Sequence, residues 1–326
     1  MAAQAANSKL LEVSGLTRHF HLGGGFLGRK AETVYAVDGI SFDLGEGETL
    51  GLVGESGCGK STAGKTILRL LTPTSGTIKL RGRDISALAK AELRPFRRDM
   101  QVIFQDPYSS LNPQMTAGDI VAEPMLNFAI AGASDRRRRA AELFQRVGLR
   151  QEAMAKYPHE FSGGQRQRLG IARALASGPS LIVCDEPVSA LDVSVQAQII
   201  NLLIDLQRQM GLSYLFIAHD LAVVQHISQR VAVMYLGKIV EIAQTDALFA
   251  EPLHPYTEAL LASVPAPDPR VKKSRKLLTG DVPSPIRPPP GCRFHTRCPY
   301  AEARCKVEEP VLEAKRDGHL VACHLR

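Results

Sequence analysis

The sequence predicts an α/β fold in which a largely parallel sheet is flanked by helices. One observation is the alternation of elements in the second half of the chain, with helices expected at residues 162–176 and 195–210 and strands at 181–184 and 213–218. Such alternation is typical of parallel sheets covered by helices. A second observation is an apolar strand at 49–53 that runs directly through a glycine-rich loop into a helical pattern.

Two further regions flank this core. Residues 10–50 mix short alternating runs with turn residues and predict antiparallel strands, with a flexible loop at residues 23–30. Further strands are expected at 77–80 and 100–104, after which the pattern turns helical. We therefore expect an inserted helical subdomain at about residues 106–160.

The composition changes again beyond residue 250. The segment 264–290 is rich in proline and is expected to be extended, and a small cysteine-containing extension follows it. The predicted organisation is one domain over residues 1–250 and a C-terminal domain over residues 251–326.

The bulk composition is that of an ordinary globular protein. The 326 residues are 44% hydrophobic and 22% charged. No apolar run approaches the roughly 18 to 20 residues that span a bilayer, and the start lacks the apolar core of a secretory signal, so we expect a cytoplasmic chain. The net charge of +7 could favour nucleic acid or anionic lipid. Because the arginines are scattered apart from the run at 136–139, we interpret it as a solvated basic surface and expect no nucleic-acid partner.

A phosphate-binding loop is predicted between the strand at 49–53 and the helix expected at 60–71, because the sequence there fits G-x-x-x-x-G-K-[ST]. Its glycines let backbone N–H groups converge on phosphate oxygens, and the helix adds its positive end. Lys60 is expected to reach the outer phosphates, Ser61 to ligate Mg²⁺ and Thr62 to bond the inner phosphate oxygens. The predicted nucleotide-binding residues here are Gly54, Glu55, Ser56, Gly57, Cys58, Gly59, Lys60, Ser61 and Thr62.

Two carboxylates end the apolar strand at 181–184. Asp185 is expected to hold Mg²⁺ through water, with Glu186 beside it. Phosphoryl transfer needs positioning and charge neutralisation more than covalent help, so one carboxylate on the metal and one on the attacking water suffice. A surface acidic pair is the weaker interpretation, given the buried strand and the following Pro187.

A rarer segment, Ser162-Gly163-Gly164-Gln165, stands shortly before this strand and opens the helix at 162–176. Its hydroxyl and N–H groups, with the helix dipole, form a second anion site too far from Lys60 to touch the same phosphates. Loop, segment and acidic strand together resemble the ATP-binding cassette (ABC) family. The resemblance implies an ABC-type P-loop ATPase fold, with a mixed sheet core, an antiparallel β subdomain and the inserted helical subdomain. It also implies that the Ser-Gly-Gly-Gln signature of one subunit closes over ATP held by another.

The same resemblance assigns further roles. Glu186 matches the general base that polarises the attacking water, and Gln105 the glutamine that senses Mg²⁺. His219, after the strand at 213–218, matches the switch histidine that contacts the terminal phosphate, and residues 189–192 match the loop that communicates across the dimer. The predicted catalytic residues are thus Glu186, His219 and Gln105, and the predicted Mg²⁺ ligands are Ser61, Gln105 and Asp185.

The nucleotide base needs an aromatic platform, and Phe20 occupies the position that the family gives to a stacking ring. Tyr35 is the alternative, because the insert at 23–30 disturbs the spacing. Either ring could instead face the core.

The whole chain resembles the ATPase subunits of bacterial dipeptide and oligopeptide importers, through residues 104–113, His254-Pro255-Tyr256-Thr257 and residues 291–299. The resemblance implies ATP and Mg²⁺ as cofactors and a peripheral position on the cytoplasmic face of the bacterial inner membrane. It implies as partners a second, usually non-identical ATPase subunit, two membrane-spanning permeases and an extracytoplasmic peptide-binding protein. The permease's coupling helix would meet the helical subdomain near Gln105. Nickel and glutathione importers use similar ATPases and stay open as alternatives.

Four of the six cysteines lie close to the end of the chain, namely Cys292, Cys298, Cys305 and Cys323. In a reducing compartment such clustering favours a metal over disulfides, although the absence of C-x-x-C is atypical of a zinc ribbon. The importer family implies a four-cysteine [4Fe–4S] cluster at this position. Zinc or no metal stays open, and His295 and His324 are possible substitute ligands.

Two rival functions are compatible with a cassette. A soluble ATPase of DNA repair or translation usually carries two cassettes or a long coiled-coil insert, and neither is visible in this sequence. A regulatory nucleotide sensor would not require the intact Glu186 and His219.

Overall fold

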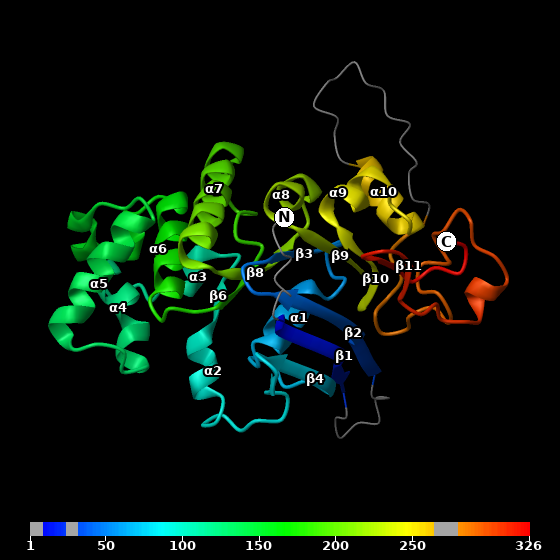
Figure 1. Ribbon diagram of the computed structural model, residues 1–326, viewed down its shortest axis with the longest axis horizontal. Helices are drawn as coiled ribbons and strands as arrows, with labels where there is room; N and C mark the ends of the chain where they lie inside the picture. The colour runs from blue at the N-terminus through cyan, green and yellow to red at the C-terminus, as the bar shows by residue number, and fades with distance from the viewer. Residues whose placement is uncertain (1–8, 24–31, 264–279) are drawn as a thin grey trace, which may run out of the picture. The chain divides into compact units, whose positions relative to one another are not determined.

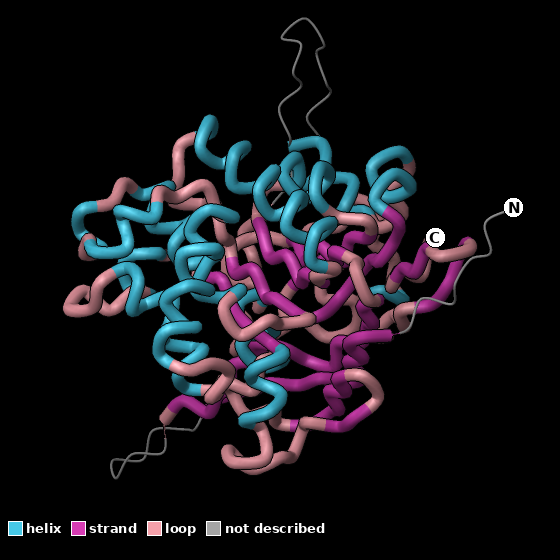
Figure 2. Tube along the Cα trace, turned by 60° about the vertical axis from the view of Figure 1, so that its left-hand side comes forward, coloured by secondary structure: helices cyan, strands magenta, loops and turns pink. Residues whose placement is uncertain are grey.

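The computed structural model describes residues 9–23, 32–263 and 280–326, most of whose helices and strands are labelled in Figure 1. These residues form two compact units. The helical unit consists of residues 9–10, Leu44–Glu48 and Ala87–Ile217. The phosphate-loop unit, named for the predicted loop that it contains, consists of the described residues of Leu11–Asp43, Thr49–Ser86 and Ala218–Arg326. Figure 2 distinguishes the helices from the strands of both units by colour.

The helical unit contains three parallel strands in the order β8-β7-β6. They are β6 (Met100–Ile103), β7 (Leu181–Asp185) and β8 (Ser213–Ala218). Every residue of β7 and β8 is buried, as is usual for parallel strands covered on both faces. This burial explains why both strands appear in the sequence as uninterrupted apolar runs.

Helices α4 (Ala117–Asn127), α5 (Ala133–Arg146) and α6 (Gly163–Leu175) contact one another in this unit (Figure 1). On α5 the buried side chains are Ala140, Leu143 and Phe144, whose spacing places them on one helix face. Arg138 and Arg139 on the same helix are exposed and pair with Asp135. The basic run is therefore a solvated helix face with acidic partners of its own.

The other elements of the helical unit are shorter or connect these parts. They are α2 (Arg94–Asp99), α3 (Pro107–Ser110), η1 (Gln151–Ala155), η2 (Pro158–Glu160) and α7 (Val193–Met210).

The phosphate-loop unit begins with a four-stranded sheet in the order β2-β1-β4-β5. Its strands are β1 (Lys9–Leu22), β2 (Glu32–Gly45), β4 (Ser75–Leu80) and β5 (Arg83–Asp84). β1 and β4 pair antiparallel, with Leu11 opposite Leu80 and Val13 opposite Ile78. All four of these side chains are buried, which confirms the antiparallel strands predicted from short alternating runs.

A second set of strands in this unit has the order β11-β12-β10-β9-β3. Its strands are β3 (Thr49–Val53), β9 (Arg230–Tyr235), β10 (Lys238–Gln244), β11 (Glu313–Arg316) and β12 (His319–Val321). β3 and β9 are parallel, and the pairs from β9 to β11 are antiparallel. The C-terminal region thus contributes two strands to the set of strands that contains β3.

The helices of this unit are α1 (Lys60–Ile67), α8 (Leu221–Ile227), α9 (Thr245–Ala250), α10 (Pro255–Ser263) and the short η3 (Arg304–Lys306). No helix within the described residues combines the length and the apolarity needed to cross a bilayer. The predicted loop at 23–30 and the predicted extended segment at 264–290 lie outside the described residues, apart from Gly23 and residues 280–290. The predicted domain boundary at 250/251 stays a prediction.

A buried carboxylate fixes the C-terminal region to β10. Glu241 has no exposed surface, and its side chain accepts the N–H groups of Leu253 at 2.7 Å and His254 at 3.0 Å. His319 of β12 lies with Nε2 at 2.6 Å from the same carboxylate. Because a buried carboxylate is costly unless its lone pairs are used, Glu241 holds residues from three segments together.

His254 makes the stability of this region depend on pH. Its ring is buried, Nδ1 accepts the Tyr256 N–H at 3.1 Å, and burial lowers the pKa of the ring to about 3 from 6.5. Below pH 6.5, His254 is therefore protonated in the unfolded chain but stays neutral in the folded chain. The free energy of unfolding should fall by at most about 1.4 kcal/mol for each pH unit below 6.5.

We expect His254→Asn, which keeps an acceptor near the position of Nδ1, to lose this pH dependence. Between pH 7.5 and pH 5, wild type should lose about 2 kcal/mol more unfolding free energy than the variant, as measured by urea denaturation at both pH values. Equal losses in the two proteins would contradict the neutral, buried His254.

Candidate active site

The predicted phosphate loop connects β3 to α1 in a backbone conformation that requires glycine. Gly54 has φ 155° and Gly59 has φ 109°, values that side chains disfavour. A Cβ at Gly54 would lie 2.1 Å from the Met234 carbonyl oxygen, and one at Gly59 would lie 2.0 Å from that of Ala36. The loop is therefore pressed against two backbone carbonyls, and larger residues at these positions would displace it.

Lys60 lies at the start of α1 with its side chain folded over the loop. It is 4% exposed, and its ammonium donates to the carbonyl oxygens of Gly54 at 2.7 Å and Glu55 at 3.0 Å. Ser61 and Thr62 follow in the first turn, where both are half-buried. A cation and a helix N-terminus thus converge on the glycine-rich loop, as anion binding requires.

Cys58 is a buried thiol inside this loop. Burial raises its pKa, although the nearby Lys60 acts in the opposite direction. The thiol is therefore protonated at neutral pH.

The acidic residues lie at the end of β7 in the helical unit. Asp185 is the last residue of the strand and is 6% exposed. Glu186 follows with φ 49°, a left-handed conformation that is uncommon for a residue with a side chain and that concentrates at functional sites. Its N–H donates to the Ile217 carbonyl at 3.0 Å, and its carbonyl accepts the Ser189 hydroxyl at 3.1 Å. These bonds on both sides of Glu186 hold the unusual backbone in place.

The structure brings Gln105 and Glu186 together. The Gln105 side-chain amide donates to the Glu186 carboxylate at 3.0 Å, and Gln105 is exposed while Glu186 is half-buried. The sequence assigned both residues to one site by resemblance, and this contact links them directly. The hydrogen bond from the Gln105 amide fixes one oxygen of the Glu186 carboxylate. The other oxygen is thereby held in one orientation and can accept a proton.

The signature segment forms the N-terminus of α6. The Ser162 hydroxyl accepts the Gln165 N–H at 3.4 Å, and the Gln165 side chain accepts the Ser162 N–H at 3.0 Å, which together form a capping box. A Cβ at Gly164 would lie 2.6 Å from Cγ1 of Val195 on α7, so this glycine allows α6 and α7 to approach. Gly163 faces Leu191 with more room.

The predicted residues His219 and Phe20 lie in the phosphate-loop unit. His219 follows β8 directly and is exposed. Phe20 on β1 is half-buried, and the Arg18 guanidinium lies over its ring at 4.4 Å from the centroid. Tyr35 on β2 is also half-buried and makes an edge contact with His19 at 4.6 Å. The choice between Phe20 and Tyr35 as the base-stacking ring stays a prediction.

The six cysteines are free thiols. Burial raises the pKa of Cys292 to about 11, and the neighbouring thiols of Cys323, Cys305 and Cys298 add to this shift. The four thiols are therefore close enough to affect one another. Within the described ranges, however, no group of three or more His, Cys, Asp or Glu side chains is arranged to hold a metal ion. The prediction of an iron–sulfur or zinc site thus has no support in the geometry.

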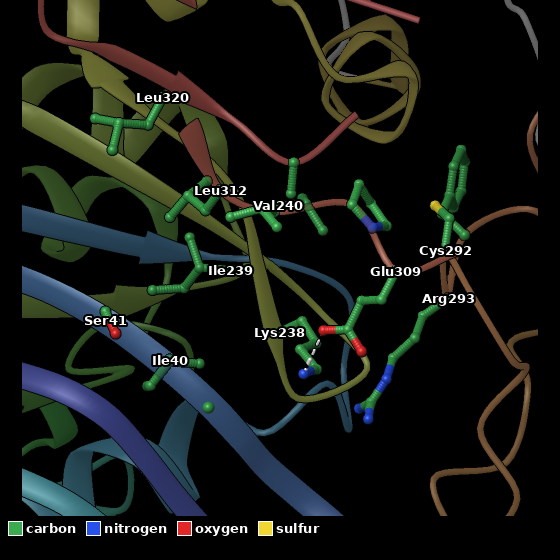
Figure 3. Close-up of a pocket in the computed structure, with 15 residues that line it drawn as sticks. Ile40, Ser41, Lys238, Ile239, Val240, Cys292, Arg293, Glu309, Leu312 and Leu320 are labelled. Atoms are coloured by element: carbon green, nitrogen blue, oxygen red, sulfur yellow. Dashed lines mark ion pairs between the residues drawn. The ribbon is translucent and has the colours of Figure 1, made fainter. Parts of the chain in front are cut away.

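A cavity of about 500 Å³ lies elsewhere in the phosphate-loop unit (Figure 3). Its walls are largely apolar and include Ile40, Ile239, Val240, Leu312 and Leu320. The Lys238 ammonium faces the Glu309 carboxylate at 2.6 Å, and Arg293 pairs with Asp38. Because its cations already have carboxylate partners, this cavity does not suit a phosphate as the glycine-rich loop does.

The sequence did not predict the contacts that Glu55 makes. Its carboxylate pairs with Arg297, and its N–H donates to the hydroxyl of Tyr256. The one signal in the sequence is the position of Glu55, because a carboxylate in a phosphate-binding loop favours a cationic partner from another part of the chain.

Two protein-family models match the chain. The model of the ABC transporter matches residues 37–189. The model of the oligopeptide/dipeptide transporter, C-terminal region, matches residues 240–305.

Relatives match over nearly the whole chain. The Probable peptide ABC transporter ATP-binding protein y4tS of Sinorhizobium fredii is 56% identical, over 97% of this chain and 90% of that protein. The Oligopeptide transport ATP-binding protein AppF of Bacillus subtilis is 53% identical, over 98% of this chain and 99% of that protein.

A solved structure matches the cassette part. The dimeric ATP-binding cassette MJ0796, in a post-hydrolysis state bound to ADP and phosphate, has a TM-score of 0.64 and 29% identity, over 72% of this chain and 98% of that one. The predicted fold class and ATPase activity are confirmed by these matches. The chain therefore belongs to the peptide and oligopeptide ABC transporter ATP-binding proteins, the ATPase subunits that power peptide import.

Proposed function

We propose that this subunit hydrolyses ATP at a site in which Glu186 is the general base, and that ATP-driven pairing with a second ATPase subunit drives import. The observation that carries the proposal is the arrangement at the end of β7. There a carboxylate with a left-handed backbone is held by Gln105 and follows the buried Asp185. Such a conformation costs free energy of order 1 to 3 kcal/mol, and aiming a base at the attacking water is a function that accounts for it.

The phosphate loop supplies the binding half of the reaction. The N–H groups of residues 56–62 and the N-terminus of α1 bind the phosphates, and Lys60 neutralises the outer ones. Mg²⁺ suits the oxygen donors of Ser61, Asp185 and Gln105, and when bound it neutralises charge on the β- and γ-phosphates. The face of Phe20, or alternatively Tyr35, stacks on the base.

Glu186 acts on water. Its carboxylate accepts a proton as the water oxygen attacks the γ-phosphorus, the bond to the β-phosphate oxygen breaks, and ADP and phosphate form. Gln105 donates to one oxygen of this carboxylate and so orients the other. His219 acts as the switch histidine and contacts the terminal phosphate.

The signature segment completes the site of the partner subunit. Ser162 and the N-terminus of α6 bind the phosphates of ATP held by the other subunit, and the partner's signature does the same for this chain. The dimeric state of the ADP- and phosphate-bound relative supports this pairing. Because each ATP then contacts both subunits, ATP binding closes the pair and hydrolysis releases it.

We propose a peripheral position on the cytoplasmic face of the inner membrane, with two permeases, a peptide-binding protein outside the membrane and a second, non-identical ATPase. The relatives are named for peptide and oligopeptide transport, which favours this assembly over a nickel or glutathione importer and over a soluble ATPase. Capture of the tagged chain from membranes should recover two hydrophobic permeases, and their absence would count against the assembly.

The four C-terminal cysteines are proposed as ligands of a [4Fe–4S] cluster, with Zn²⁺ as the alternative. The support is chemical, since four thiols that affect one another's pKa lie within the last 35 residues, and four cysteines are the usual ligands of such a cluster. Because the described side chains do not form a metal-holding group, binding requires them to reorient.

We expect Glu186→Gln to bind ATP with near-normal affinity and to hydrolyse it at least about 100-fold more slowly, because the amide cannot accept the proton. With ATP bound and not hydrolysed, the variant should accumulate in the paired state, as measured by light scattering with and without ATP. Glu152→Gln, at an exposed residue of η1, is the matched control.

A second change tests the pairing itself. Ser162→Arg in the Glu186→Gln background should bind ATP as an isolated chain and yet fail to pair, because Ser162 acts on the partner's ATP. Ser134→Arg, exposed in the first turn of α5, controls for the added charge. Near-normal hydrolysis by Glu186→Gln, or pairing that survives Ser162→Arg, would refute these roles.

For the cysteine proposal, protein purified without oxygen should contain about four iron and four sulfide per chain. Cys298→Ser should lose them, whereas Cys58→Ser, in the phosphate loop, should retain them. Protein without iron and sulfide but with zinc would select the alternative, and protein with no metal would remove the proposal.

A further inference from the structure

The side chain of Glu55, the second residue of the phosphate loop, is held by an arginine from 242 residues further along the chain. Arg297 donates from Nη1 to Oε2 at 2.8 Å and from Nη2 to Oε1 at 3.1 Å. Arg297 is 8% exposed and the Glu55 side chain 27% exposed, so the pair is shielded from water mainly on the arginine side. Paired guanidinium and carboxylate groups in this geometry are among the stronger polar contacts in proteins.

The backbone of Glu55 is held as well. Its N–H donates to the hydroxyl of Tyr256 at 2.8 Å, and its carbonyl accepts from Lys60 at 3.0 Å. The N–H of Glu55 is thus committed to Tyr256 and turned away from phosphate, whereas the N–H groups that the motif uses come later in the loop. Two residues of the C-terminal region therefore fix the start of the loop.

Both residues are anchored rigidly. Tyr256 is fully buried and packs against Tyr235 and Phe294 with ring centroids 4.7 and 5.4 Å away. Arg297 lies in a tight segment in which its own N–H donates to the Phe294 carbonyl at 3.0 Å. An ion pair of flexible surface side chains contributes little to stability, because ordering the side chains costs conformational entropy. Arg297 and Tyr256 are already held by their neighbours, so this cost is small.

The pair also solves an electrostatic problem. A carboxylate beside a triphosphate repels it, and a fixed guanidinium cancels that repulsion. Hydrogen bonding to Glu55 raises the pKa of Arg297 above its already high usual value, so the guanidinium stays charged. We propose that Arg297 and Tyr256 are positioning residues for ATP binding, which act on the phosphate loop through Glu55. The inference rests on the proposed role of this loop.

The test measures ATP affinity and turnover for Arg297→Met, Glu55→Gln and the double variant in the complete chain. Arg297→Met should weaken ATP binding about tenfold, because it leaves Glu55 charged and unpaired beside the phosphates, and change kcat by less than about threefold. In the Glu55→Gln background the same change should weaken binding by about twofold or less, because the charge that Arg297 cancels is gone. If Arg297→Met acted only by destabilising the fold, its effect on ATP binding would be the same in both backgrounds.

Two further variants complete the test. Tyr256→Phe keeps the buried ring, removes only the acceptor for the Glu55 N–H, and should weaken ATP binding severalfold at nearly constant kcat. Arg316→Met is the matched control, since Arg316 makes a similar bidentate pair with Glu251 at the surface of the C-terminal region, and it should leave ATP affinity unchanged.

Lys60→Ala separates the two possible failures. If it binds ATP normally, the role of the loop itself is wrong. If Lys60→Ala loses binding while Arg297→Met keeps wild-type affinity, or if the effects of Arg297→Met and Glu55→Gln simply add, the positioning role is overturned.

Discussion

The phosphate loop is held in place by close contact with the backbone beneath it. Gly54 and Gly59 bring the loop so close to the carbonyls of Met234 and Ala36 that no Cβ fits between them. The Cys58 carbonyl accepts the Gly237 N–H at 2.8 Å, which adds a third fixed point. A loop held in this way presents its N–H groups already oriented, so that little ordering is needed when phosphate binds.

The C-terminal region also contacts the phosphate loop, through Arg297 and Tyr256. Glu241, buried among Leu253, His254 and His319, holds this region on the strand that pairs with β9. β9 carries Met234 and Tyr235, so the carbonyl that supports Gly54 and the ring that supports Tyr256 are neighbours in sequence. Arg297 and Tyr256, in the region that Glu241 holds, both bond to Glu55 of the loop. In the role that we propose for Arg297 and Tyr256, the C-terminal region is part of the nucleotide site.

Local signals predicted the elements that carry the chemistry. β3 and β8 have the predicted bounds, since a continuous apolar run ends where burial ends. α6 begins one residue after the predicted start at Ser162, which is its capping residue. β11 was missed because its four residues are all exposed and three of them are charged, and β12 because it has only three residues. β12 forms through pairing with β10, and β11 through pairing with β12, so neither carries a pattern of its own.

The site itself was predictable where a motif fixes spacing and not where distant segments meet. The phosphate loop, Asp185, Glu186 and the signature segment could be found from sequence, and the contact of Gln105 with Glu186 joins two of the predicted residues. The left-handed backbone of Glu186 depends on Ile217 and Ser189, and the pair of Glu55 with Arg297 spans most of the chain. Neither leaves a local trace. The cysteines show the opposite limit, because their clustering and the family resemblance predicted a metal, whereas the described side chains are not arranged to hold one.

An equilibrium ATP titration of Gly59→Ala, compared with Gly82→Ala, tests whether the packed backbone of the loop forms the ATP site. Both glycines have positive φ, but a Cβ at Gly82 meets nothing within 4 Å, whereas one at Gly59 meets the Ala36 carbonyl. We expect Gly59→Ala to bind ATP at least about 100-fold more weakly, from backbone strain and displacement of the loop, and Gly82→Ala to bind as wild type does. Wild-type affinity in Gly59→Ala would show that this packed backbone does not form the ATP site.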